Sequence, residues 1–174
     1  MKTYAAFLRG VNVGGVNLKM ADVSAALSSA GFTAVRTILA SGNVVLTTPR
    51  DARGVRSTAE TILRREFGYQ AWVLVYEMAT LQSIVDGYPF EPEVYGHHSY
   101  VTFVCDPVAL DELAGLAATA GPGESITRGD GVIYWQVPRS MTLASAMGKT
   151  MGNSRYKSST TTRNLRTLGK VLRG

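Results

Sequence analysis

Cysteine is almost absent from this 174-residue chain, and long apolar runs are absent altogether. Cys105 has no second thiol with which to form an internal disulfide, which fits a reducing cytoplasm. It ends an apolar run, so we expect it to be buried. The longest apolar run, residues 71–76, is far below the roughly 20 residues that span a bilayer. The apolar run before Arg9 is also too short for a signal peptide. The sequence therefore predicts a cytoplasmic protein without a membrane segment.

Residues that bind metals or act as nucleophiles are also scarce. The two histidines, His97 and His98, are neighbours, and adjacent side chains of a strand point to opposite faces. They cannot share one ion without a bend, so we predict no metal and no cofactor. Ser41 lacks the G-x-S-x-G pattern of a nucleophile elbow, and spacing ties no histidine or carboxylate to it. The sequence assigns no reaction.

Charge is unevenly distributed along an otherwise ordinary globular composition. Apolar residues make up 45% of the chain and charged residues 18%, which predicts a real core. The formal net charge is +5, from 18 Lys and Arg against 13 Asp and Glu. No acid follows Asp130, so residues 131–174, with eight cations, carry +8. Residues 1–130, with ten cations and 13 acids, carry −3. The basic segment favours an acidic partner.

Apolar runs and helical spacing alternate through the first half of the chain. Short β-branched or apolar runs indicate strands, and apolar positions at i, i+3, i+4 and i+7 indicate helices. A Gly-Asn turn joins two of the strands as a hairpin. The strands are residues 4–8, 32–39, 44–48 and 71–76, and the helices are residues 20–30 and 55–67. The order β-α-β-β-α-β is that of the ferredoxin-like plait.

The second half restarts the same order after a turn-rich link. A strand over residues 99–105 precedes a helix that begins at Asp106-Pro107, and a hairpin signal follows around residues 128–131. A helix over residues 141–149 comes next. The Ser/Thr-rich stretch 152–162 reads as a loop, so no closing strand is evident.

The last helix is predicted to begin near Arg163 and to be amphipathic. Its cations, Arg166, Lys170 and Arg173, fall on one side, and its leucines fall on the other. We therefore predict an α+β protein of two tandem ferredoxin-like (βαββαβ) sub-domains. The predicted parts are a first sub-domain over residues 1–77, a connecting helix and loop over 78–97, a second sub-domain over 98–151, and a basic loop and helix over 152–174.

Four groups of residues carry a family resemblance that covers nearly the whole chain. They are Arg9-Gly-Val-Asn-Val-Gly-Gly15 with Lys19-Met20, Ser41-Gly-Asn43, Tyr134-Trp-Gln136, and Thr162-Arg-Asn164 with Thr167. Together they resemble the uncharacterised bacterial domain-of-unknown-function family 1697. The resemblance implies two ferredoxin-like sub-domains in tandem, in agreement with the pattern of elements. It implies no activity.

A candidate ligand site follows from the predicted topology. The first two strands run parallel and end at one edge, so the Gly-rich loop 10–18 lies beside the hairpin tip 41–43. Glycines let backbone N–H groups approach an anion, and a helix N-terminus adds positive potential. The predicted ligand-binding residues are Arg9, Asn12, Asn17, Lys19, Ser41 and Asn43. The ligand would carry phosphate, as a nucleotide or a nucleic acid. The alternative is structural: Gly14-Gly15 give the chain room to turn, and Asn12 and Asn17 hydrogen-bond the loop's own backbone.

The basic C-terminal segment is a second candidate for the same ligand. Eight cations without an acid form an electrostatic footprint for phosphodiesters, although a solvated amphipathic cap is the alternative. If the last helix folds back over the first sub-domain, Arg163 and Asn164 join the Gly-rich edge. These two residues complete the predicted site.

Two other functions are compatible with the sequence. An enzyme acting on a small anionic substrate would use the same edge, with Lys19 or Lys149 as an electrophilic or basic group. A protein–protein adaptor would use the open sheet edge of an incomplete second half. RNA recognition by stacking on central strands is disfavoured, because residues 44–46 contain no aromatic side chain.

Overall fold

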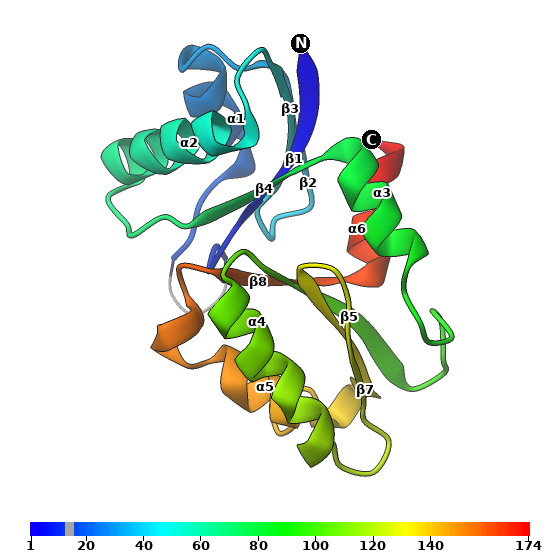
Figure 1. Cartoon of the computed structure of the whole chain (residues 1–174). Helices are drawn as coiled ribbons and strands as arrows, with labels where there is room; N and C mark the ends of the chain where they lie inside the picture. Colours follow the sequence, from blue (N-terminus) through cyan, green and yellow to red (C-terminus); the bar gives the residue numbers. More distant parts are fainter. Residues whose placement is uncertain (13–15) are drawn as a thin grey trace. The chain divides into compact units, whose positions relative to one another are not determined.

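The chain forms two compact units in a computed structural model that describes residues 1–12 and 16–174 (Figure 1). Unit 1 comprises Met1–Gln82 and Lys170–Gly174, and unit 2 comprises Ser83–Gly169. The chain enters unit 2 within helix α3 (Met78–Asp86) and returns to unit 1 within helix α6 (Leu165–Arg173). The described residues form a mixed α/β protein with two four-stranded antiparallel sheets and six α-helices.

Unit 1 has the predicted β-α-β-β-α-β order. Its elements are β1 (Lys2–Leu8), α1 (Met20–Ser29), β2 (Thr33–Ile38), β3 (Asn43–Thr48), α2 (Ala52–Phe67) and β4 (Val73–Glu77). The strand order is β2-β3-β1-β4, and every neighbouring pair is antiparallel. Helices α1 and α2 lie on one side of this sheet (Figure 1).

The core of unit 1 follows from strand and helix periodicity. Alternate residues of β1 share one face of the sheet, and those facing the helices pack against the apolar stripes of α1 and α2. This core includes Tyr4, Ala6, Leu8, Val23, Leu27, Val44, Leu46, Val55, Ala59 and Leu63. Asp51 caps α2 by accepting from the backbone N–H of Gly54 at 2.8 Å, and Gly68 ends the helix in the left-handed conformation.

Unit 2 repeats this order of strands and helices. Its elements are β5 (His97–Val104), α4 (Pro107–Ala114), β6 (Ser125–Arg128), β7 (Val132–Pro138), α5 (Ala146–Met151) and β8 (Thr160–Asn164). Three short 3₁₀ turns also occur: η1 (Gly115–Thr119), η2 (Arg139–Met141) and η3 (Ser154–Tyr156). The strand order is β6-β7-β5-β8, and all neighbouring pairs are antiparallel.

The prediction that the second half lacks a closing strand is wrong. Strand β8 pairs with β5 from Tyr100↔Asn164 to Val104↔Thr160. The predicted loop 152–162 therefore ends inside a strand, and α6 begins at Leu165 instead of Arg163. The open edge beside β5, on which the adaptor alternative depended, is occupied.

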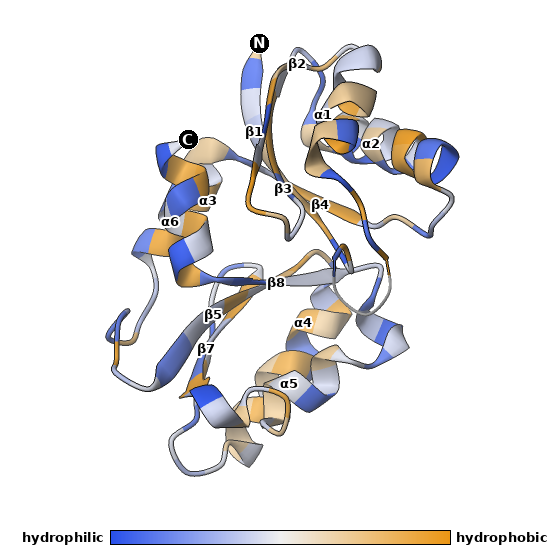
Figure 2. Cartoon of the chain, turned by 180° about the vertical axis from the view of Figure 1, so that it is seen from behind, coloured by the Kyte–Doolittle hydropathy of each residue, from blue (hydrophilic) through white to orange (hydrophobic). Residues whose placement is uncertain are grey.

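The polar composition of β8 explains why its sequence resembles a loop. Its threonines are β-branched and suit a strand, but apolar alternation is missing. Its threonine hydroxyls form hydrogen bonds instead: those of Thr102 and Thr162 lie 2.8 Å apart, and that of Thr160 donates to the backbone carbonyl of Tyr156 at 2.8 Å. In Figure 2, β3 and β4 are mostly coloured as hydrophobic, whereas β8 is pale to blue.

Cys105 is exposed, so the prediction that it is buried is wrong. Strand β5 ends at Val104, one residue earlier, and the backbone N–H of Cys105 donates to Ser159 O at 2.9 Å. Its position past the end of the strand moves it out of the alternating buried pattern. Among the described helices, none is long and apolar enough to cross a membrane.

The motif Tyr134-Trp-Gln136 ties the segment between α3 and β5 to strand β7. The Tyr134 hydroxyl donates to Ile84 O at 2.6 Å, and the Tyr88 hydroxyl donates to Trp135 O at 3.0 Å. Gln136 Nε2 donates to Glu91 O at 2.7 Å and to Ser99 Oγ at 3.0 Å. This motif has a structural role in unit 2, because buried polar side chains here satisfy an irregular backbone.

Candidate functional site

The predicted edge of unit 1 brings the loop after β1 beside the tip of the β2–β3 hairpin. Both β1 and β2 are antiparallel to β3, so they run in the same direction and end together. Leu8 N donates to Gly42 O at 2.8 Å. Gly42 has φ +82°, and a Cβ there would lie 2.9 Å from the Leu8 Cβ, so only glycine suits this contact. Residues 13–15 of the predicted Gly-rich loop lie outside the described residues.

Asn12 joins the two parts of this edge with its side chain. Its Nδ2 donates to Ala40 O at 2.5 Å and to Leu18 O at 3.1 Å, while its Oδ1 accepts from Leu18 N at 2.9 Å. The backbone is left-handed at φ +56°, a conformation that asparagine tolerates better than most residues. Both amide hydrogens are used inside the protein, so Asn12 shapes the edge.

Asn43 has a similar role at the hairpin tip. It is fully buried, and its Nδ2 donates to Ile38 O at 2.9 Å and to Ser41 Oγ at 2.8 Å. Ser41 itself is exposed. The structural alternative therefore describes Asn12, and Asn43 has a corresponding role within the hairpin, whereas Asn17 and Ser41 are exposed.

Lys19 gives the edge its exposed positive charge. It occupies the N-cap of α1, where no side chain caps the helix, and Asn17 beside it is also exposed. Asp51, Asp106 and Ser145 cap α2, α4 and α5. A cation at a helix N-terminus adds to the positive end of the helix dipole instead of compensating it. Asp22, in the first turn of α1, offsets part of this positive charge.

Arg9 follows β1 at the same edge and is partly buried. Burial lowers the pKa of its guanidinium, which nevertheless stays charged at neutral pH. Its backbone N–H donates to Trp72 O at 3.0 Å, which fixes the chain beside the start of β4.

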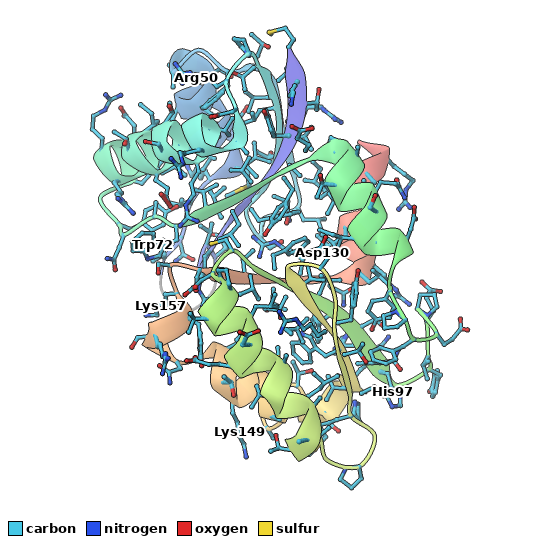
Figure 3. The ribbon with its side chains drawn as sticks, viewed as in Figure 1. Arg50, Trp72, His97, Asp130, Lys149 and Lys157 are labelled. Atoms are coloured by element: carbon cyan, nitrogen blue, oxygen red, sulfur yellow. The ribbon has the colours of Figure 1, made fainter. Side chains whose placement is uncertain are left out.

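Two residues that the sequence did not single out for the site meet beside the start of β4: Arg64 of α2, and Trp72, which precedes the strand. The Arg64 guanidinium lies 4.6 Å from the centre of the Trp72 ring and donates to Ala71 O at 2.7 Å. Figure 3 labels Trp72 at this end of unit 1. The sequence shows Trp72 near the start of an apolar run, but it does not show the contact with Arg64, because Arg64 lies on the preceding helix α2.

The last two predicted site residues, Arg163 and Asn164, belong to β8 in unit 2. The Arg163 side chain is buried and donates to Thr161 Oγ1 at 2.7 Å and to Thr162 O at 2.9 Å. Asn164 Oδ1 accepts from the backbone N–H of Arg166 at 2.9 Å and so caps α6. That Arg163 and Asn164 join the Gly-rich edge of unit 1 stays a prediction.

Folding redistributes the charge that the sequence places at the C-terminus. Unit 1 contains eleven Lys and Arg against five Asp and Glu, a formal charge of +6, whereas unit 2 contains seven against eight, a charge of −1. Within unit 2, Arg155 forms an ion pair with Glu112, and Arg166 forms one with Glu93 at 3.2 Å. The basic excess therefore belongs to the unit that holds the candidate edge.

Two other kinds of site were considered, a metal site and a catalytic lysine. Across residues 1–12 and 16–174, no group of three or more His, Cys, Asp or Glu is placed to hold a metal ion. Lys149, one of two lysines considered for catalysis, is exposed on α5 in unit 2, whereas Lys19 belongs to unit 1 (Figure 3).

Comparison with known proteins places the chain in a family. The family DUF1697, described as a protein of unknown function, matches residues 1–134. The chain belongs to the DUF1697 family. The resemblance seen in the short motifs is thus confirmed, and the DUF1697 description assigns no activity.

One solved structure shares the fold along nearly the whole length. It is that of the conserved bacterial protein SP0830 from Streptococcus pneumoniae, with a TM-score of 0.80 and 19% sequence identity. The match covers 99% of this chain and 97% of that chain. A crystal structure of an unknown protein from Galdieria sulphuraria matches at 11% identity and a TM-score of 0.27, over 94% of this chain and 96% of that one. No curated protein matches the chain.

Proposed function

We propose that unit 1 binds the phosphate group of a nucleotide or a nucleic acid at the edge formed by Arg9, Asn17, Lys19 and Ser41. The observation that carries this proposal is the exposed Lys19 at the N-cap of α1, a helix start without a side-chain cap. A cation in this place adds to the positive end of the helix dipole, Asp22 in the first turn offsets part of that charge, and a bound anion would offset more of it.

The charge of unit 1 supports the same ligand class. A formal charge of +6 attracts polyanions over distances comparable to the Debye length, about 8 Å at physiological salt. Asn12 joins the loop to Ala40 O of the hairpin, and Asn43 bonds Ile38 O and Ser41 Oγ within the hairpin, so hydrogen bonds of the protein itself shape the edge. A preformed edge loses less conformational entropy when a ligand binds.

The proposal extends to the fold and the location. Each unit is a ferredoxin-like sub-domain, with residues 1–77 and 98–151 as their central parts. In support, both units have the β-α-β-β-α-β order, and the strand orders β2-β3-β1-β4 and β6-β7-β5-β8 correspond position by position. A protein whose single cysteine is exposed suits the reducing cytoplasm.

Lys19→Ala provides the test, with Lys149→Ala as the control. Each variant removes one exposed lysine and the same charge, but Lys149 belongs to unit 2. Binding of a labelled single-stranded oligonucleotide and of ATP would be measured by fluorescence anisotropy and calorimetry at several salt concentrations. Circular dichroism would verify that both variants fold.

We expect Lys19→Ala to weaken binding by about tenfold and to reduce the slope of log affinity against log salt by about one. Lys149→Ala should bind as the unchanged protein does. Equal affinities of the unchanged protein and Lys19→Ala, or no binding to either ligand, would exclude the edge as a phosphate site.

A further inference from the structure

Three basic side chains gather in unit 2 at the end of the sheet where β5 begins. His98 lies opposite Val137 and His97 lies opposite Pro138 in the β5–β7 ladder. The backbone N–H of Arg139 donates to Gly96 O at 2.8 Å, which extends this pairing by one more residue. Arg139 and His98 are therefore diagonal neighbours on one face, a separation that long side chains bridge.

The other neighbour of β5 brings a second arginine to the same end. Tyr100 pairs with Asn164, the last residue of β8, and Arg166 follows two residues later near the same end of β5. The chain turns into α6 at this point, and Asn164 fixes the turn by accepting from the backbone N–H of Arg166 at 2.9 Å. The Arg166 side chain is 67% exposed and pairs with Glu93 at 3.2 Å.

The charges around His98 are unbalanced in favour of cations. Partial burial and the positive charges of Arg139 and Arg166 together lower the pKa of His98. Glu93 is the acid on this side, and it is engaged by Arg166. The Tyr100 ring lies 5.5 Å from the imidazole and brings no charge at neutral pH. The neighbouring His97 directs a ring nitrogen to Tyr95 O at 3.1 Å (Figure 3).

We propose that His98, Arg139 and Arg166 form a second anion site, in unit 2, for a dianionic oxyanion such as a phosphomonoester. Guanidinium groups bind such oxyanions through paired N–H donors, and a protonated imidazole adds another donor. The two negative charges favour proton uptake by His98, and the ligand would share Arg166 with the exposed carboxylate of Glu93. The site is separate from the edge of unit 1 and does not depend on the function proposed there.

Binding at this site should be linked to the protonation of His98. In the free protein the two arginines disfavour the imidazolium, whereas a bound dianion favours it. Affinity should therefore be higher when His98 is protonated and should fall as the pH rises through the pKa of His98 in the complex.

Nuclear magnetic resonance of the two histidines tests the site directly. The pKa values of His97 and His98 would be measured between about pH 5 and about pH 8 in sulfate, which does not titrate there, and in chloride of equal ionic strength. His97→Gln assigns the two signals. We expect sulfate to raise the pKa of His98 and to leave that of His97 unchanged. An equal response in chloride, or the same shift at His97, would show ionic screening only and overturn the proposal.

Arginine variants then identify the groups that hold the anion. Arg139→Gln and Arg166→Gln should each weaken sulfate and phosphate binding by about tenfold. Arg128→Gln, which removes an exposed arginine that also pairs with an acid, Asp111, should have no effect. If both arginine variants retain full affinity, the proposal is wrong.

The source of the anion is resolved by comparing inorganic phosphate with a nucleoside monophosphate. Either ligand supports the site if it raises the pKa of His98, and the tighter one indicates whether the rest of the ester contributes. Lys19→Ala should leave this response intact. The His98 response therefore tests the unit 2 site even if the unit 1 edge binds no phosphate.

Discussion

Tyr69 is partly buried, and its hydroxyl oxygen is buried with no hydrogen-bond partner among the described residues. It packs against the core of unit 1, and burial raises its pKa to about 12. An unsatisfied buried hydroxyl costs free energy that a phenylalanine ring does not. We therefore expect Tyr69→Phe to stabilise the protein by about 1 kcal/mol at neutral pH, as measured by urea unfolding.

The same substitution should change the response to alkaline pH. An unfolded tyrosine loses its proton near pH 10, whereas native Tyr69 keeps it until about pH 12. Between these values the unfolded state binds fewer protons than the native state, so the stability of the unchanged protein falls as pH rises. The advantage of Tyr69→Phe should therefore be larger at about pH 11 than at about pH 8. Tyr95→Phe, at a fully exposed tyrosine, is the control, and an equal advantage at both pH values would contradict the assignment.

The candidate site shows how far residue types alone predict a role. The sequence placed Asn12, Lys19, Ser41 and Asn43 at one edge, because strand direction follows from element order. It did not separate the residues that build the edge from those that face solvent. That distinction depends on Ala40 O and Ile38 O, backbone acceptors whose positions appear only when the chain folds.

At the scale of elements, local pattern predicted the strands that bury apolar side chains but missed β8, whose buried residues are polar. Strands β1, β3 and β7 are mostly buried runs of apolar residues. Strand β8 is held by Thr162 against Thr102, sixty residues earlier, and the Thr102 hydroxyl also accepts from Trp135 Nε1 at 2.9 Å. No window of sequence around β8 contains these partners, which explains why the strand resembled a loop.

The segment between α3 and β5 should loosen when its attachment to β7 is removed. Gln136→Met keeps the approximate size of the side chain but loses the hydrogen bonds to Glu91 O and Ser99 Oγ. We expect a loss of about 2 kcal/mol in unfolding free energy, because a carbonyl and a hydroxyl inside the unit lose their donor. Chymotrypsin should also cleave after Phe90 more rapidly, as followed by mass spectrometry.

Gln70→Met serves as the control for this prediction, since Gln70 is exposed in unit 1. It should alter neither stability nor cleavage. If Gln136→Met is cleaved at the same rate as the unchanged protein, the segment is held by contacts other than the Gln136 amide.

At the scale of the whole molecule, charge follows the compact units and not the order of residues. The sequence describes a basic C-terminal segment, yet unit 1 carries +6 and unit 2 carries −1. The difference arises because residues 131–169 share unit 2 with eight acids, while Lys170 and Arg173 return to unit 1. A polyanion should therefore be attracted to unit 1 more strongly than to unit 2.

The path of the chain predicts that the two units unfold together. Helices α3 and α6, of nine residues each, both contain residues of both units. Helices this short do not persist in water without packing, so unfolding of either unit removes helical turns from the other. Val171→Ala, at a fully buried position of α6 in unit 1, should cost about 2 kcal/mol. Native-state hydrogen exchange should show the same loss in β1–β4 and in β5–β8.

Val108→Ala, at an exposed valine of α4, is the control and should change the stability of neither sheet. A loss confined to unit 1 would mean that each unit folds as a separate cooperative element despite the shared helices.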